Sequence, residues 1–168
     1  MAAPLAWALS APSRAGRAVA LRPFEPADLT ETVAMWHASK RAAFPYNAEQ
    51  QRHTLDDDTK FFCDAVAPRC WVWLALDGDR IAGFVAVRGE WIDHLFVRTD
   101  LQRRGVGSAL LAKAIALAPG GLRLFTFQRN APARRFYEKH GFRAVAFGVS
   151  PPPESEPDVE YRRDPATR

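Results

Sequence analysis

The most informative segment of the sequence lies in the middle of the chain and reads Val97-Arg98-Thr99-Asp100-Leu101-Gln102-Arg103-Arg104-Gly105-Val106-Gly107-Ser108. The apolar run ending at Val97 predicts a strand, and the apolar period beginning at Val106 predicts a helix. The turn between them is basic, and the first N–H groups of a helix attract anions. Gly105 and Gly107 would let a ligand approach without a Cβ in its way. The stretch therefore indicates a phosphate-binding turn, but an ordinary strand-to-helix turn with solvated arginines has the same pattern.

Working outward from this turn, the remaining segments predict a mixed α/β domain. The predicted strands cover residues 18–21, 70–76, 80–88, 91–97, 122–127, 142–149 and 159–162, and the predicted helices cover 26–40, 56–66, 106–117 and 130–140. Asp77-Gly78-Asp79 predicts a tight hairpin between two of the strands. This order favours an α/β (α+β) fold with a mixed, curved sheet of six to seven strands and about four helices on its two faces.

Composition limits the chain to one domain, because 168 residues with 48% hydrophobic and 25% charged residues suit a single globular core. We expect this domain to span residues 17–168, with the Ala/Pro/Ser-rich residues 1–16 as a flexible extension or, less simply, a transit peptide. The net charge of +4 suits an anionic ligand but is too scattered to indicate nucleic acid.

The sequence also indicates which cellular location and which metal chemistry to expect. No apolar run approaches the roughly 18 residues of a membrane span, so no membrane partner is expected. Cys63 and Cys70 have neither the density of a disulfide scaffold nor zinc-ligand spacing. We therefore expect a cytoplasmic protein without a metal ion.

Three segments resemble one family. Gln102-Arg103-Arg104-Gly105-Val106-Gly107 is similar to the Q/R-x-x-G-x-G/A motif of the GNAT superfamily of acyl-CoA-dependent N-acyltransferases. Ile92-Asp93-His94-Leu95-Phe96-Val97 resembles the strand before that motif, and residues 130–142 resemble the family's N-x-x-A-x-x-F-Y-x-x-x-G-F segment. The resemblance spans roughly residues 21–147 and implies a GNAT-like single domain whose central strands splay apart.

The same resemblance implies acetyl-CoA, or a related acyl-CoA, as the acyl donor. It assigns backbone contacts with the pantetheine arm to Phe96 and Val97 and a further cofactor contact to Asn130. It assigns the pyrophosphate to a continuous run of residues, Gln102, Arg103, Arg104, Gly105, Val106, Gly107 and Ser108.

Two steps of the implied reaction need protein groups. The resemblance places Tyr137 near the thioester sulfur, where a phenol could protonate the leaving thiolate. The alternative is an aromatic ring that only packs under its helix, but a Tyr instead of a Phe beside Phe136 favours a role for the hydroxyl. An amine attacks only when neutral, so a base must accept a proton directly or through a water chain. Asp93 and His94 are the candidates and point to opposite faces of one strand. We favour Asp93; His94 is the alternative, and each has an equally good structural explanation.

The function expected from the resemblance is direct transfer of an acetyl group from acetyl-CoA, bound first, to a primary amine of a small molecule or peptide. No covalent acetyl-enzyme is expected, and a homodimer is possible. His53 and the aspartates Asp56, Asp57 and Asp58 could form an acidic rim for a cationic amine, but helix capping explains the aspartates as well. The alternative function is a non-catalytic acyl-CoA-binding sensor or interaction module with the same fold.

Overall fold

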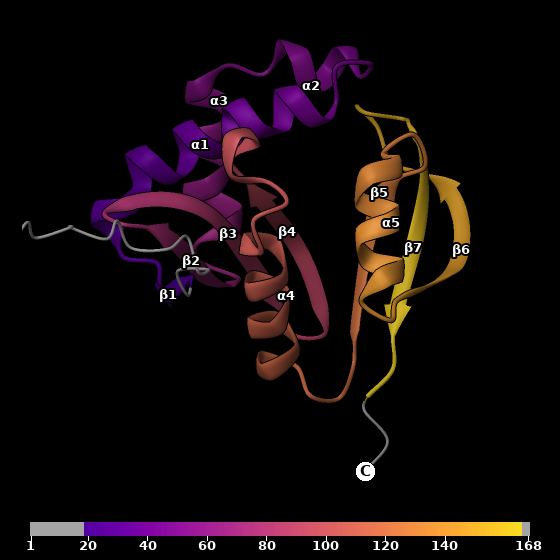
Figure 1. Ribbon diagram of the computed structural model, residues 1–168. Helices are drawn as coiled ribbons and strands as arrows, with labels where there is room; N and C mark the ends of the chain where they lie inside the picture. The colour runs from indigo at the N-terminus through magenta and orange to yellow at the C-terminus, as the bar shows by residue number, and fades with distance from the viewer. Residues whose placement is uncertain (1–18, 166–168) are drawn as a thin grey trace, which may run out of the picture.

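The computed structural model describes residues 19–165 (Figure 1). The expected extension, residues 1–16, lies outside the described residues. The strands are β1 (Ala20–Pro23), β2 (Trp71–Asp77), β3 (Arg80–Arg88), β4 (Trp91–Val97), β5 (Leu122–Phe127), β6 (Arg143–Val149) and β7 (Pro157–Arg163). The α-helices are α1 (Leu29–Ala43), α2 (Ala48–Arg52), α3 (Leu55–Phe61), α4 (Val106–Leu117) and α5 (Ala131–Lys139).

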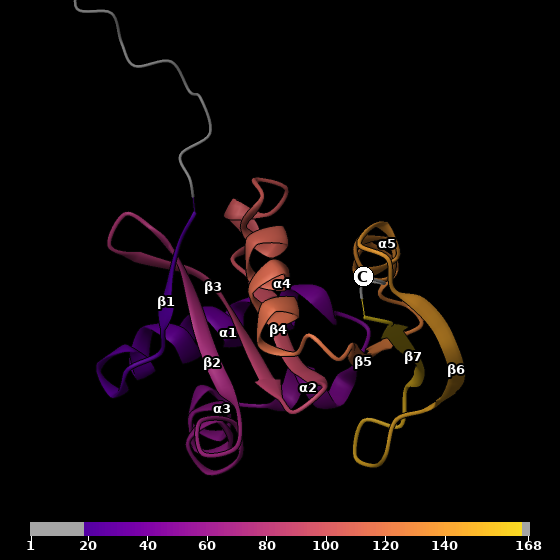
Figure 2. The same ribbon diagram turned by 90° about the horizontal axis from the view of Figure 1, so that it is seen from below.

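All seven strands form one mixed sheet in the order β1-β2-β3-β4-β5-β7-β6. Every neighbouring pair is antiparallel except β4 and β5, which run parallel and are in register at a single pair, Trp91 opposite Arg123. Beyond that pair the strands separate, so the sheet divides into an arm of β1–β4 and an arm of β5, β7 and β6 (Figures 1 and 2). The predicted splay of the central strands is confirmed.

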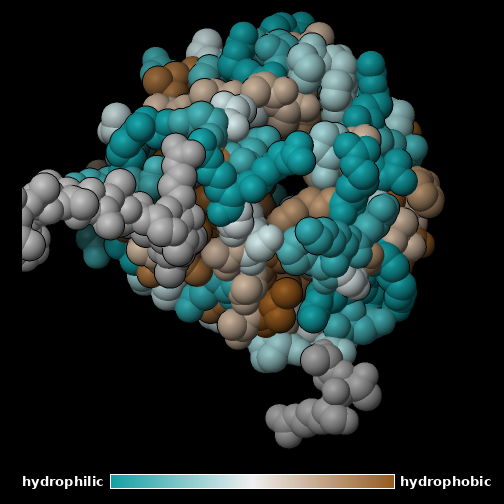
Figure 3. All heavy atoms as spheres, in the orientation of Figure 1, coloured by the Kyte–Doolittle hydropathy of each residue, from teal (hydrophilic) through white to brown (hydrophobic). Residues whose placement is uncertain are grey.

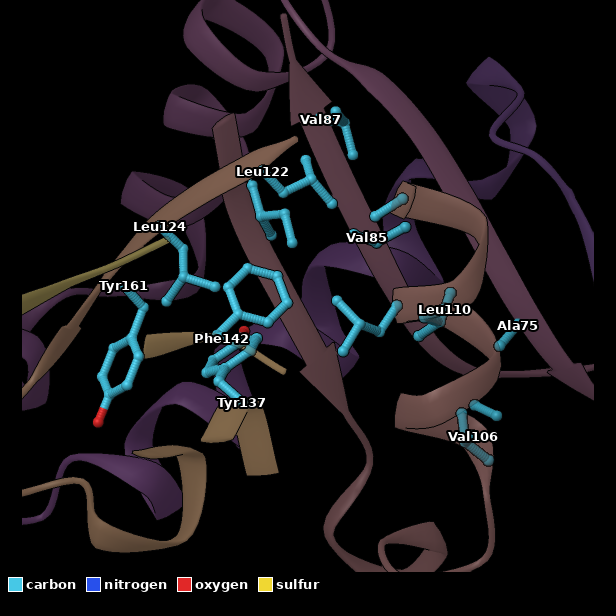
Figure 4. Close-up of a cluster of buried hydrophobic side chains, with 14 of the residues drawn as sticks. Ala75, Val85, Val87, Val106, Leu110, Leu122, Leu124, Tyr137, Phe142 and Tyr161 are labelled. Carbon is cyan, nitrogen blue, oxygen red and sulfur yellow. The ribbon is translucent and has the colours of Figure 1, made fainter. Parts of the chain in front are cut away.

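Helices cover both faces of the sheet. Side chains of the central strands alternate between the two faces, and both sets are buried against these helices. Phe84 and Ala86 of β3 join one core cluster with side chains of α1, whereas Val85 and Val87 join a second cluster with side chains of α4 and α5. Figure 4 shows the second cluster, in which Tyr137 and Phe142 lie near the side chains of β5 and α4. This cluster ties the two arms together.

The helical part of the N-terminal half differs from the prediction. Five α-helices replace the expected four, because α2 was not predicted; Asn47 caps it by accepting a hydrogen bond from the backbone N–H of Gln50. The helix predicted from residue 26 begins at Leu29, after a 3₁₀ turn over Pro26–Asp28. No helix within residues 19–165 is long and apolar enough to cross a membrane.

Candidate active site

A cavity of about 1470 Å³ lies between the two arms of the sheet. It is lined by β4, the N-terminal turn of α4, β5 and α5, and by side chains of α1, α2 and α3. Figure 3 shows the surface hollowed between α4 and α5, with hydrophilic residues around the opening. Pockets for one small molecule usually hold about 300–1,000 Å³, so this cavity has room for a large ligand and a second one beside it.

The N-terminus of α4 is built to receive an anion. Gly105 precedes the helix with a φ of +86°, and Arg103 has a φ of +61°, so the chain turns sharply where β4 leads into the helix. No side chain caps this end, and the first intrahelical bond runs from the N–H of Ala109 to the carbonyl of Gly105. The N–H groups of Val106, Gly107 and Ser108 therefore lack helical partners and are available to an anion.

Most predicted cofactor residues line this cavity, namely Phe96, Val97, Gln102, Arg103, Gly105, Gly107, Ser108 and Asn130. Arg104 is exposed and does not line it, and the side chain of Val106 is buried in the core, so Val106 can contribute only its backbone. Asn130 is the N-cap of α5, where its side-chain oxygen accepts from the N–H of Ala133 at 3.3 Å. Its amide NH₂ has no hydrogen-bond partner among residues 19–165 and can contact a ligand.

His140 links α4 to α5 at the edge of the cavity. Its Nδ1 lies 2.8 Å from the carbonyl oxygen of Phe136, which can only accept, so Nδ1 carries the proton. In the neutral ring, Nε2 then accepts from the hydroxyl of Ser108 at 3.1 Å. A Cβ on Gly107 would lie 3.4 Å from the ring of Phe136. The two helices thus approach closely where the α4 turn begins.

Tyr137 and Tyr161 are neighbours with different hydroxyl environments. The Tyr161 hydroxyl donates to Glu138 and accepts from Arg134, so its hydrogen-bonding capacity is used. The Tyr137 hydroxyl has no hydrogen-bond partner within residues 19–165, and the residue lines the cavity although it is only 7% exposed. Burial raises the pKa of Tyr137, so the phenol keeps its proton at neutral pH. A protonated, unpartnered phenol in a cavity is available to a ligand.

Asp93 and His94 both line the cavity, but they differ in charge and in hydrogen-bond partners. The Asp93 carboxylate binds the Arg88 guanidinium at 2.7 and 3.1 Å and also accepts from the Cys70 thiol. Burial lowers the pKa of His94 to about 4, so its ring is neutral at physiological pH. The ring lies among aromatic side chains, 5.1 Å from Trp36 between centroids, and has no hydrogen-bond partner within residues 19–165. Its lone pair is therefore free, whereas Asp93 is held by a cation.

The helices α1 and α3 form one wall of the cavity around a buried ion pair. Asp58 is 2% exposed and accepts from Lys40, which is 5% exposed, and its other oxygen lies 2.7 Å from Nδ1 of His37. Asp57 instead closes a capping box with Thr54. These two aspartates of the expected acidic rim are therefore not available to a cationic amine, because Asp57 caps a helix and Asp58 is neutralised by Lys40.

Three contacts connect the α1–α2 region to the second arm. The rings of Phe44 and Phe127 lie 5.0 Å apart, and the Arg129 guanidinium lies 4.4 Å from the centre of the Tyr46 ring. The side-chain amide of Gln50 donates to Glu154 at 3.0 Å. The sequence pattern does not single out Gln50 as a site residue. Nothing in the sequence indicates that Gln50 and Glu154, 104 positions apart, would meet.

Comparison with known proteins identifies the class to which this fold and site belong. The model of the acetyltransferase (GNAT) family matches residues 33–142. The peptidyl-lysine N-acetyltransferase YjaB of Salmonella typhimurium is 32% identical over 114 residues, which cover 67% of this chain and 75% of that protein. The chain therefore belongs to the GNAT family and is an N-acetyltransferase.

Solved structures agree with this assignment. The solution structure of apo YjaB from Escherichia coli superposes with a TM-score of 0.75 at 26% identity, covering 89% of this chain and all of that one. The crystal structure of a Bacillus anthracis acetyltransferase in complex with acetyl coenzyme A has a TM-score of 0.53 at 26% identity and covers 58% of this chain and 63% of that one.

Proposed function

We propose that this acetyltransferase binds acetyl-CoA in the cavity between the two arms and transfers the acetyl group directly to a primary amine. The observation that carries the proposal is that one cavity joins the uncapped N-terminus of α4 to the unpartnered phenol of Tyr137. The domain proposed for this activity covers residues 17–168.

The residues present fit acetyl-CoA. The free N–H groups of Gly107 and Ser108 and the positive charge of Arg103 suit a pyrophosphate. Beyond Trp91, no residue of β4 is in register with β5, so the β4 backbone groups that point away from β3 lack a strand partner there. One of the adjacent residues Phe96 and Val97 can offer such groups to an extended arm. Asn130 adds a side-chain amide on the opposite arm. Arg104 is proposed as a weaker, electrostatic contributor because it lies outside the cavity lining.

The chemistry needs a proton to leave the amine and a proton to reach the sulfur. Acetyl-CoA supplies the acetyl group as a thioester. Tyr137 holds a proton at its hydroxyl and can donate it to the departing sulfur. Asp93 stays a prediction as the base, and its carboxylate would have to exchange its contacts with Arg88 and Cys70 for the amine or a water. His94 is the alternative: its lone pair has no partner within residues 19–165, but burial lowers its pKa to about 4, which makes the ring a weak base at neutral pH.

The acceptor we propose is a small-molecule or peptide amine, with the lysine side chain the first peptide group to test. The name of the YjaB relatives, peptidyl-lysine N-acetyltransferase, supports that order. We also propose that the protein acts in the cytoplasm, in agreement with the free thiols of Cys63 and Cys70.

The test is a calorimetric titration with acetyl-CoA, followed by a panel of amines assayed for release of free thiol. We expect micromolar binding and turnover on one class of amine. Binding without turnover on any amine would favour the acyl-CoA sensor. If acetyl-CoA does not bind at all, the assignment of the α4 turn is wrong.

A further inference from the structure

We propose that the acceptor end of the cavity holds a subsite for a positive charge on the acceptor other than the amine that is acetylated. The groups we assign to it are the carboxylates of Glu154 and Asp158 and the buried side-chain carbonyl oxygen of Gln50; all three residues line the cavity, and Gln50 is hydrogen-bonded to Glu154. This inference rests on the proposed function, because it concerns the acceptor of the same reaction.

The first observation is an uncompensated negative charge. Most other carboxylates around this end have cationic partners: Asp58 binds Lys40, Glu49 binds Arg52, and Glu156 lies 3.8 Å from Arg129. Within residues 19–165, no lysine, arginine or histidine lies within ion-pair distance of Glu154 or Asp158. Asp158 is only 8% exposed, and buried charges in proteins are normally paired. A ligand cation would supply the missing partner.

The second observation is independent of charge. Gln50 is 9% exposed, and its Oε1 is buried without any hydrogen-bond partner. Its Nε2 donates to Glu154, and this hydrogen bond fixes the orientation of the amide. The oxygen Oε1 is therefore the amide atom that lacks a partner. A buried acceptor without a hydrogen-bond partner is unfavourable, so a donor from a ligand would remove that cost. Carboxylates and a carbonyl oxygen only accept hydrogen bonds, and the group that satisfies all three is an ammonium or guanidinium.

The reacting nitrogen itself does not suit this subsite. Attack on the thioester needs a neutral amine, and two nearby carboxylates favour the protonated form. The acceptor chemistry that fits is therefore a molecule with two basic groups, such as a diamine or a peptide in which lysine is next to another basic residue. Arg129 also lines the cavity, and it is already engaged with Glu156 and Tyr46.

The experiment compares acceptors that differ only in the second charge. Wild type, Glu154→Gln, Asp158→Asn and the double variant are assayed with 1,5-diaminopentane against pentylamine, and with blocked Lys-Lys against Lys-Ala dipeptides. The measured quantity is the ratio of kcat/KM within each pair. We expect wild type to prefer the doubly charged acceptor by about tenfold or more and the double variant to lose that preference. Asp79→Asn, in the exposed β2–β3 turn, is the matched control and should keep the wild-type ratio.

A second readout separates this inference from the proposed function. The same four probes are titrated by calorimetry into the protein saturated with CoA. If the doubly charged probes bind about tenfold more weakly to the double variant, the subsite is supported even if no amine is acetylated. In that case only the proposed function fails. Equal ratios and equal affinities in wild type and the double variant would overturn the subsite.

Discussion

Tyr137 has a free hydroxyl, whereas the hydroxyl of the neighbouring Tyr161 is bonded on both sides. We predict that Tyr137→Phe lowers kcat by about 100-fold, because general acid catalysis contributes at least about that factor. The affinity for acetyl-CoA should stay within about twofold, since the ring and its packing remain. Steady-state kinetics and calorimetry measure the two quantities.

Tyr161→Phe is the control for that experiment. It removes a hydroxyl that bonds Glu138 and Arg134, so the melting temperature should fall while kcat is largely kept. Unchanged turnover in Tyr137→Phe would show that this tyrosine only packs under its helix.

His94 gives the fold a dependence on pH. Its pKa is about 4 in the folded protein, against an ordinary value of 6.5, because the charged ring would lose its hydration among aromatic side chains. As pH falls from 6.5 towards 4, the unfolded chain takes up a proton that the folded chain does not. Stability therefore decreases over this window, by on the order of 3 kcal/mol in total.

The variant His94→Phe should flatten this dependence, because an apolar ring of similar shape carries no proton. The measurement is the free energy of unfolding in urea at several pH values between 7 and about 4. A slope as steep in His94→Phe as in wild type would assign the effect to other groups.

At the scale of the elements, the start of α4 defines the proposed cofactor site. We predict that Gly107→Glu abolishes binding of acetyl-CoA. The new carboxylate would repel a pyrophosphate, and its Cβ would already lie 3.4 Å from the Phe136 ring. Calorimetry measures the binding. Gly120→Glu, after the end of α4 and with open space around its Cβ, should bind as wild type does. Retained affinity in Gly107→Glu would refute the site.

Elements that depend on local sequence were predictable, and those that depend on distant contacts were not. The strands around the hairpin at Gly78 and the helix α4 have clear periodicity and turn residues. The helix α2 has only five residues, too few for an apolar period, and was missed. The divergence of β4 from β5 leaves no trace in the strand patterns; only the family resemblance implied it.

The two ends of the site also differ in how far the sequence predicts them. The cofactor end was predictable because one continuous turn, residues 102–108, forms most of it. The acceptor end brings Gln50 together with Glu154, 104 residues away. The ion pair of Asp93 with Arg88 was also missed, because the two residues meet only when β3 and β4 form their hairpin.

At the scale of the whole molecule, β6 is an unprotected edge of the sheet. All seven of its residues are exposed, Phe147 and Val149 by 63% and 64%, and no charge lies between residues 144 and 149. Edge strands of monomers usually carry charges or prolines that prevent pairing. The homodimer implied by the resemblance stays a prediction, and β6 is where we expect a second copy to pair.

Phe147→Lys tests that expectation by placing a charge in the middle of the edge. Sedimentation analysis should find a dimer for wild type and a monomer for the variant. A monomeric wild type, or a variant that remains dimeric, would contradict pairing through β6.

The contacts that join Gln50 to Glu154 and Phe44 to Phe127 have a consequence for the order of events in turnover. They connect the two arms at the acceptor end, while the α4 turn lies at another part of the same cavity. The two substrates can therefore occupy different parts of one cavity at the same time. The kinetics should then be sequential, with both substrates bound before either product leaves.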